Sequence, residues 1–133
     1  MKIVVGYDGS EASKRALERA ARFDRGDPVT VVSVQEVHVS AGRGPARVDE
    51  TEKAERDREL AEAAAILRAH GAEARQVHGH GDPARAIAEE AEATRADLIV
   101  VGTHGRGAFG RAMLGSVSTK LVHQAPCDVL VVR

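Results

Sequence analysis

Short apolar runs alternate along this chain with longer segments in which apolar residues recur at helical spacing. The short runs are rich in Val and Ile and are bounded by polar or glycine-containing segments, which is typical of strands. They cover residues 2–7, 28–34, 73–77, 97–101 and 127–132, and the third, weakly apolar, is expected at an edge. Strands that alternate with helices and are apolar throughout predict an α/β fold, a parallel sheet with helices on both faces.

Polar residues and glycines mark where the intervening helices begin and end. Ser10 is placed to cap the first helix, and Asp82, followed by a proline, is placed to cap the third. A long charged helix over residues 49–70 is expected to end at Gly71, and the last helix is expected over Ser116–Gln124. The apolar stripe of the first helix comprises Ala12, Ala16, Leu17, Ala20 and Phe23.

Composition narrows the class of protein. The 133 residues suit a single domain over residues 1–133, and a hydrophobic share of 43% is enough for a core. Aromatic residues make up only 2% and the net charge is −1, which argues against a protein that stacks nucleic-acid bases or binds them through a basic surface. The single cysteine, and the absence of a signal-peptide pattern and of a long apolar run, predict a cytoplasmic protein without a membrane segment.

The stretch GTHGRGAFGRAMLGSVS, residues 102–118, joins the fourth predicted strand to the last helix. Its glycines let backbone N–H groups face an anion, and Gly115 and Ser116 stand where a helix N-terminus favours negative charge. The hydroxyls of Ser116 and Ser118 add donors. In an open parallel sheet this loop lies at the ligand-binding edge, beside the loop after the first strand. The stretch therefore indicates phosphate binding, although it lacks the lysine of a P-loop and a loose surface loop is the alternative.

The spacing Gly102-x2-Gly105-x9-Gly115-Ser116 resembles the nucleotide-binding signature of the universal stress protein family, in its ATP-binding subgroup. The resemblance covers essentially the whole chain. IVVGYDGSEASKRAL is similar to the family's first strand and helix, GDPARAI to its third loop and helix, and APCDVLVVR to its closing strand. It implies a Rossmann-like, open five-stranded parallel sheet in the order 3-2-1-4-5, with an ATP site where the strand order reverses.

The resemblance also implies which residues form the ATP site. Asp8 would lie on the adenine and ribose side, and Val34 would pack against the base, with Val101 flanking the site. The phosphates would be held by Gly102, Gly105, Gly115 and Ser116, with the backbone of Val117 nearby. Mg2+ is expected to accompany ATP, held largely by phosphates and water. Asp8 is a candidate to assist through a water, and its alternative role is to form the turn before Ser10.

The last predicted strand suggests a contact with a second molecule. In the order that the resemblance implies, this strand is an edge of the sheet, and its sequence DVLVV is apolar, β-branched and free of proline. An uncovered edge of this kind invites pairing with another chain. Pairing with the same strand of a second copy would give a two-fold dimer. The family resemblance implies the same homodimer, through Asp128 to Val132.

These features and the resemblance favour a small regulatory protein that binds ATP, acts as a dimer and is read by a partner, and the resemblance alone implies a role in the stress response. The alternative is a slow Mg-dependent ATPase or a phosphoryl-transfer enzyme. The sequence has no evident pair of catalytic carboxylates and no kinase motif, and His104 near Asp8 is the best acid–base pair that it offers. A structural dimer without a ligand is a third interpretation, which the intact glycine spacing disfavours.

Two further groups of polar residues have both a functional and a structural interpretation. The segment HGHGD, residues 78–82, contains potential metal ligands but matches no strong zinc spacing, so a strand end followed by a helix cap is favoured. His80 within it is a candidate contact to a nucleotide. Arg106 and Arg111 suit phosphate recognition as well as a solvated loop edge.

Structural roles are expected at two other places. Cys127 is followed by an aspartate that disfavours a thiolate, so a buried structural cysteine is predicted. Pairs such as Glu52 with Arg56, one helical turn apart, predict a solvated outer face on the long charged helix.

Overall fold

The computed structural model describes residues 1–33, 50–104 and 115–133, in which strands and helices alternate. The strands are β1 (Ile3–Tyr7), β2 (Val29–Ser33), β3 (Ala74–His78), β4 (Leu98–Gly102) and β5 (Asp128–Val132). The helices are α1 (Glu11–Phe23), α2 (Glu50–Ala69), α3 (Pro83–Thr94) and α4 (Ser116–Gln124). Each predicted element is present, with bounds within about a residue of those expected.

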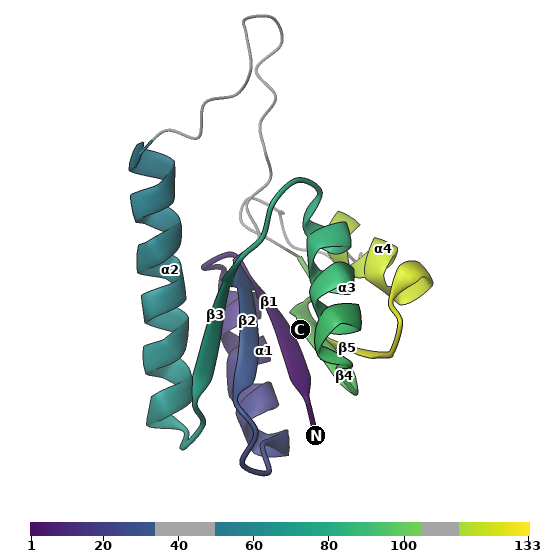
Figure 1. Cartoon of the computed structure of the whole chain (residues 1–133), viewed down its shortest axis with the longest axis horizontal. Helices are drawn as coiled ribbons and strands as arrows, with labels where there is room; N and C mark the ends of the chain where they lie inside the picture. The colour runs from purple at the N-terminus through teal and green to yellow at the C-terminus, as the bar shows by residue number, and fades with distance from the viewer. Residues whose placement is uncertain (34–49, 105–114) are drawn as a thin grey trace, which may run out of the picture.

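The strands form one parallel sheet in the order β3-β2-β1-β4-β5, which confirms the predicted Rossmann-like arrangement (Figure 1). β1 lies in the centre, where Val5 pairs with Val31 of β2 on one side and with Val100 of β4 on the other. β3 and β5 are the edge strands. The edge position of β3 agrees with its weakly apolar sequence, because an edge strand leaves more of its surface to solvent.

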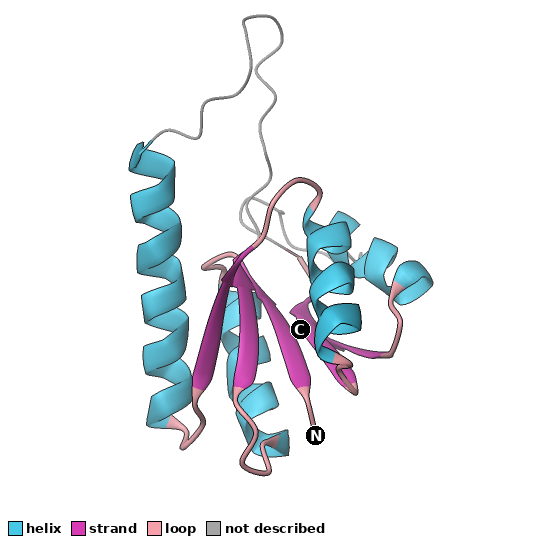
Figure 2. Ribbon diagram, in the orientation of Figure 1, coloured by secondary structure: helices cyan, strands magenta, loops and turns pink. Residues whose placement is uncertain are grey.

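Helices cover both faces of the sheet, as Figure 2 shows. On one face α1 and α2 bury Leu17 and Leu67 against β1 and its neighbours. On the other face α3 and α4 bury Ile87 and Leu121. None of the helices in the described ranges is long and apolar enough to cross a membrane.

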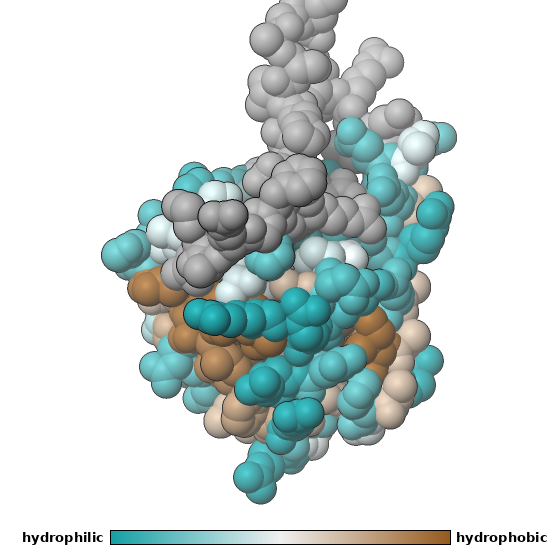
Figure 3. All heavy atoms as spheres, turned by 180° about the vertical axis from the view of Figure 1, so that it is seen from behind, coloured by the Kyte–Doolittle hydropathy of each residue, from teal (hydrophilic) through white to brown (hydrophobic). Residues whose placement is uncertain are grey.

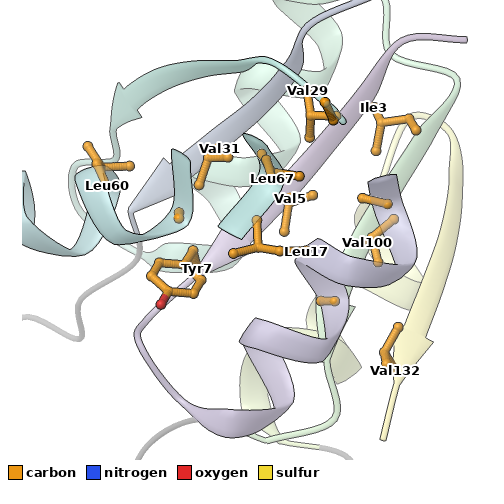
Figure 4. Close-up of a cluster of buried hydrophobic side chains, with 14 residues drawn as sticks. Ile3, Val5, Tyr7, Leu17, Val29, Val31, Leu60, Leu67, Val100 and Val132 are labelled. Atoms are coloured by element: carbon orange, nitrogen blue, oxygen red, sulfur yellow. The ribbon is translucent and has the colours of Figure 1, made fainter. Parts of the chain in front are cut away.

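The cluster beneath α1 and α2 is built almost entirely from aliphatic side chains (Figure 4). Burying each large aliphatic side chain stabilises the fold by roughly 1.5–3 kcal/mol. A chain with few aromatic residues can therefore build its core from many Val, Leu and Ile side chains. Among the described residues of this cluster, Tyr7 is the one aromatic side chain, and it stands at the carboxyl end of β1 with its hydroxyl at the margin of the cluster.

Local capping follows the sequence. Ser10 Oγ accepts a hydrogen bond from the Ser13 N–H at 3.2 Å, and Asp82 Oδ2 accepts one from the Arg85 N–H at 3.1 Å. After α2, Gly71 has a φ of +83°, a left-handed value that favours glycine. The predicted caps at Ser10, Asp82 and Gly71 are therefore confirmed.

Two predictions about helix surfaces are wrong. Phe23 continues the apolar stripe of α1 in sequence but is 37% exposed, because it is the last residue of the helix and lies at the margin of the core. Arg56 was expected on a solvated face but is only 8% exposed, since α2 turns this side toward the loop after β3. There Arg56 Nη1 donates to the Gly79 carbonyl at 3.4 Å.

Candidate functional site

The carboxyl ends of β1 and β4 lie side by side in the middle of the sheet, where the strand order reverses. Open α/β sheets bind ligands at such a switch point, because the connections that leave the two strands diverge there. The loop after β1 and the glycine-rich stretch after β4 both start at this point. The structure therefore places the starts of the two segments that the sequence singled out next to each other.

The loop after β1 is closed by its own side chains. Asp8 Oδ1 accepts a hydrogen bond from the Ser10 N–H at 2.9 Å, and Gly9 has a φ of +80°. Ser10 then caps α1, while Ser13 Oγ donates to the Ser10 carbonyl at 2.9 Å. Asp8 thus has the turn-forming role that the sequence offered as its alternative. Its contact with a nucleotide stays a prediction.

Gly102 has a packing role in this structure. A Cβ at this position would lie 2.7 Å from Ala12 Cβ and 2.8 Å from the backbone carbonyl carbon of Ala12. The first turn of α1 therefore rests directly on the end of β4, where a side chain would not fit. Because this role is independent of any ligand, glycine at this position is not by itself evidence for a phosphate site.

The first turn of α4 is held against Thr103, the residue that follows β4. The Thr103 carbonyl accepts a hydrogen bond from the Gly115 N–H and another from Ser118 Oγ at 3.1 Å. The Thr103 N–H in turn donates to the Val132 carbonyl at 2.8 Å, at the end of β5. A Cβ on Gly115 would lie 3.0 Å from the Thr103 carbonyl oxygen and 3.1 Å from His104 Cα. The start of the helix and the end of the strand are thus in backbone contact.

The cap of this turn distinguishes α4 from α1 and α3. Its cap residue is Gly115, and in the described part of the chain no side chain caps the turn, whereas Ser10 and Asp82 cap the other two helices. The first N–H groups of an α-helix have no acceptor within the helix. The N–H groups of Ser116 and Val117 therefore offer donors at the switch point, together with the positive end of the helix dipole.

The two serines of this turn have different surroundings. Ser116 is exposed, and its predicted role as a phosphate donor stays a prediction. Ser118 is only 1% exposed, and its Oγ donates toward the carbonyls of Thr103 and Gly115 at 3.1 and 3.0 Å. The prediction that the Ser118 hydroxyl is a donor for phosphate is therefore wrong, because its proton is used inside the protein. Val117 is half-buried and packs against the core beneath α3 and α4.

The remaining predicted residues divide into those the structure describes and those it does not. Val101 is 3% exposed and its side chain belongs to the core beneath α3 and α4. His104 Nδ1 lies 2.9 Å from the hydroxyl of Thr103, the residue before it. Outside the described residues lie Val34, Gly105, Arg106 and Arg111.

A polar cluster that the sequence did not reveal lies beside the end of β1. The buried Tyr7 hydroxyl donates to Glu62 Oε1 at 2.8 Å, and the same carboxylate oxygen lies 3.2 Å from Lys14 Nζ. Burial and then the hydrogen bond to Glu62 raise the pKa of Tyr7, so the hydroxyl keeps its proton. The hydrogen bond to Glu62 raises the pKa of Lys14 as well. Through Tyr7, Lys14 and Glu62, these contacts join β1, α1 and α2 next to Asp8, the residue that follows β1.

The segment HGHGD, which begins at the last residue of β3, makes structural contacts. His78 Nε2 lies 3.0 Å from Asp57 Oδ1 on α2, and Asp82 both caps α3 and accepts a hydrogen bond from Lys120 Nζ at 3.0 Å. The bonds from Lys120 and from the Arg85 N–H hold the pKa of Asp82 below its usual value. Across the described ranges, no group of three His, Cys, Asp or Glu side chains is arranged to hold a metal ion.

Cys127 is half-buried rather than fully buried. Burial and then the negative charge of Asp128 raise the pKa of its thiol. A thiol with a raised pKa is a poor nucleophile, which agrees with the predicted structural role.

Known proteins resemble this chain over its whole length. The model of the universal stress protein family matches residues 1–133. A universal stress protein from Thermus aquaticus is 40% identical over 98% of this chain and 97% of its own length. Another, from Methanocaldococcus jannaschii, is 34% identical over 99% of this chain and 81% of its own length.

Solved structures agree with the sequence comparisons. A universal stress protein from Archaeoglobus fulgidus in complex with dAMP has a TM-score of 0.77 at 28% identity, over 100% of this chain and 98% of that one. A universal stress protein in complex with cAMP has a TM-score of 0.78 at 29% identity, over 100% of this chain and 97% of that one. Given the matching sequence, sheet order and fold, this chain belongs to the universal stress protein family.

Proposed function

We propose that this protein binds an adenine nucleotide, ATP, at the carboxyl ends of β1 and β4. The observation that carries the proposal is the first turn of α4, which begins at Gly115 without a side-chain cap and stands at the switch point of the sheet. A helix start of this kind attracts phosphate through its N–H groups and its dipole. The dAMP and cAMP held by two related structures support an adenine nucleotide over other anions.

In this proposal the predicted residues surround the nucleotide from two sides. On the phosphate side stand Gly102, Gly105, Gly115, Ser116 and the backbone of Val117. On the base and ribose side stand Asp8 and Val34, with Val101 flanking the site. The packing of α1 on the end of β4 supports this assignment of a phosphate side and a base side, because it keeps the loop after β1 close to the start of α4.

The proposed ligand is ATP because the glycine spacing resembles that of the ATP-binding subgroup. A triphosphate carries more negative charge than one helix N-terminus compensates. Mg2+ is therefore expected to accompany it, bound mainly by phosphate oxygens and water.

A homodimer through Asp128 to Val132 is the second part of the proposal. β5 is an edge strand, and its apolar residues Val129, Leu130 and Val131 are only partly buried. Figure 3, seen from behind, has an apolar area on the side of the molecule that carries β4 and β5. Pairing two copies of β5 would give hydrogen-bond partners to the free backbone groups of this edge strand and would cover these side chains. Sedimentation at micromolar concentration should give a dimer, and a monomer there would remove this part of the proposal.

The role that follows is a small regulatory module of the stress response in the cytoplasm, whose nucleotide state is read by another protein. Titration calorimetry on nucleotide-free protein tests the nucleotide site. We expect Mg-ATP to bind at a single site in each chain, and ATP without magnesium to bind more weakly. Phosphate release from the same samples separates a binding module from a slow Mg-dependent ATPase. The absence of binding heat with ATP, ADP and AMP would contradict the proposal.

A further inference from the structure

We infer that Ser118 is a positioning residue for the phosphate-binding turn of α4, an inference that rests on the proposed function. Ser118 itself is too buried to touch a ligand, with 1% of its surface exposed. Its hydroxyl lies 3.1 Å from the Thr103 carbonyl oxygen and 3.0 Å from the Gly115 carbonyl oxygen. One buried hydroxyl therefore links the end of β4 to the start of α4.

Thr103 gives this link a fixed anchor. Its N–H donates to the Val132 carbonyl at 2.8 Å, which ties it to the end of β5. Its carbonyl accepts from both the Gly115 N–H and Ser118 Oγ, and a carbonyl oxygen has two lone pairs, so both bonds can form together. The first turn of α4 is thus attached to two strands of the sheet.

The link matters because α4 lacks the usual means of closing its first turn. In α1 the Ser10 side chain accepts the N–H of Ser13, which stabilises the turn but occupies a donor. Gly115 offers no such acceptor to α4. The Ser118 hydroxyl shares its one proton between the carbonyls of Thr103 and Gly115, so it holds the turn without accepting any of the N–H groups at the start of α4. Donors that are held in place before binding give tighter binding, because less ordering is left to be done.

α1 supplies a matched control for this inference. Ser13 is the third residue of α1, as Ser118 is the third residue of α4, and it is 4% exposed. Its Oγ donates to the Ser10 carbonyl at 2.9 Å, the counterpart of the bond from Ser118 to the Gly115 carbonyl. Ser13→Ala and Ser118→Ala therefore remove the same buried atom from the same position of two helices.

The test titrates both variants and the wild type with Mg-ATP and with adenosine, which shares the base and ribose but has no phosphate. We expect Ser118→Ala to weaken ATP binding by roughly fivefold, the equivalent of one hydrogen bond, and to leave adenosine binding unchanged. Ser13→Ala should leave both affinities unchanged. Equal losses for the two ligands, or the same ATP loss in both variants, would overturn the inference, as would full ATP affinity in Ser118→Ala. A wild type that binds neither ligand would instead overturn the proposed function.

Amide hydrogen exchange in the nucleotide-free protein gives a readout that needs no ligand. The Gly115 N–H is bonded to Thr103, and the Thr119 N–H donates to the Gly115 carbonyl at 3.0 Å. Both amides should exchange faster in Ser118→Ala than in the wild type and should be unaffected in Ser13→Ala. Unchanged exchange at both amides in Ser118→Ala would show that the hydroxyl does not hold this turn.

Discussion

α1 and α4 start against neighbouring residues at the end of β4, but their first turns are closed differently. α1 rests on Gly102 and is capped by the Ser10 side chain. α4 rests on Thr103 and begins at Gly115 without a side-chain cap. In the described residues, the start of α1 therefore has a side-chain acceptor for one of its free N–H groups, and the start of α4 has none. A Cβ would crowd the neighbouring backbone at Gly102 and at Gly115, so the missing side-chain cap of α4, and not the glycine alone, is the difference on which the proposed phosphate site rests.

A charged side-chain cap on α4 should remove the difference between the two helix starts. Of the substitutions considered, it should have the largest effect, which is on ATP affinity. In Gly115→Asp, the new carboxylate would stand where the phosphates are proposed, and two like charges about 4 Å apart repel by roughly 4 kcal/mol near a protein surface. We expect ATP binding to weaken more than about a hundredfold in calorimetric titrations.

The control for this substitution is Gly115→Asn. Asparagine has nearly the same size as aspartate and meets the same Thr103 backbone, but it carries no charge. It should retain clearly more ATP affinity than Gly115→Asp. Equal losses in the two variants would mean that crowding against Thr103, and not charge at a phosphate site, explains the effect.

Crowding the first turn of α1 against Gly102 should lower the stability of the fold. A Cβ in Gly102→Ala would meet Ala12 at 2.7 Å, and overpacking against a helix backbone costs about 2 kcal/mol. We expect a loss of that size in the free energy of unfolding, measured by urea denaturation. Gly71→Ala, whose Cβ would meet open space but whose φ is +83°, should lose about 1 kcal/mol and keep its ATP affinity. A Gly102→Ala protein as stable as the wild type would refute the packing role.

Removing the cap of α1 should have a smaller effect. Ser10→Ala leaves the Ser13 N–H without its acceptor, which should lower the free energy of unfolding by about 1 kcal/mol. Ser116→Ala, at the exposed start of α4, should leave stability unchanged, because no cap is lost there. Thermal denaturation of both variants measures the contrast, and similar losses would mean that the two helix starts do not differ as described.

The smallest expected effect is that of Asp82, the cap of α3, whose contribution to the free energy of unfolding should depend on pH. Lys120 and the Arg85 N–H lower the pKa of Asp82 from its ordinary 3.8. A carboxyl with a lowered pKa stabilises the fold when ionised, so this contribution is complete above pH 3.8 and is lost as the pH falls through the lowered value. The free energy of unfolding of the wild type should therefore exceed that of Asp82→Asn by roughly 0.5 kcal/mol at neutral pH. The difference is small because the pair of Asp82 and Lys120 is exposed to solvent. The gap should shrink in acid, and a gap that widens there would contradict the assignment.

Features that depend on neighbours in the chain are predictable from the sequence. Ser10 and Asp82 are recognisable as caps because a cap acts within a single helical turn. The strands are recognisable because each is a short apolar run, and the family resemblance supplied their order in the sheet. The location of the candidate site follows from that order, since it fixes which strand ends are neighbours.

Features that depend on distant segments are not predictable in this way. Gly102 looks like part of a phosphate loop in sequence, but the crowding around it comes from Ala12 on another element. Arg56 looks solvated because charges occur all along α2, and only the packing of that helix shows that it is buried. Ser118 looks like a ligand donor until the carbonyl of Thr103 is placed beside it. For the same reason the contacts of Asp8 with a nucleotide stay a prediction.

The most direct measurement follows the backbone amide resonances of Ser116 and Val117 by NMR during titration with Mg-ATP and then with adenosine. We predict large downfield shifts of both amides with ATP and none with adenosine, while the Ser13 amide, already bonded to Ser10, stays in place with either ligand. If ATP leaves the two amides of α4 unshifted, or shifts them no more than adenosine does, phosphate does not bind at this turn and the proposed site is wrong.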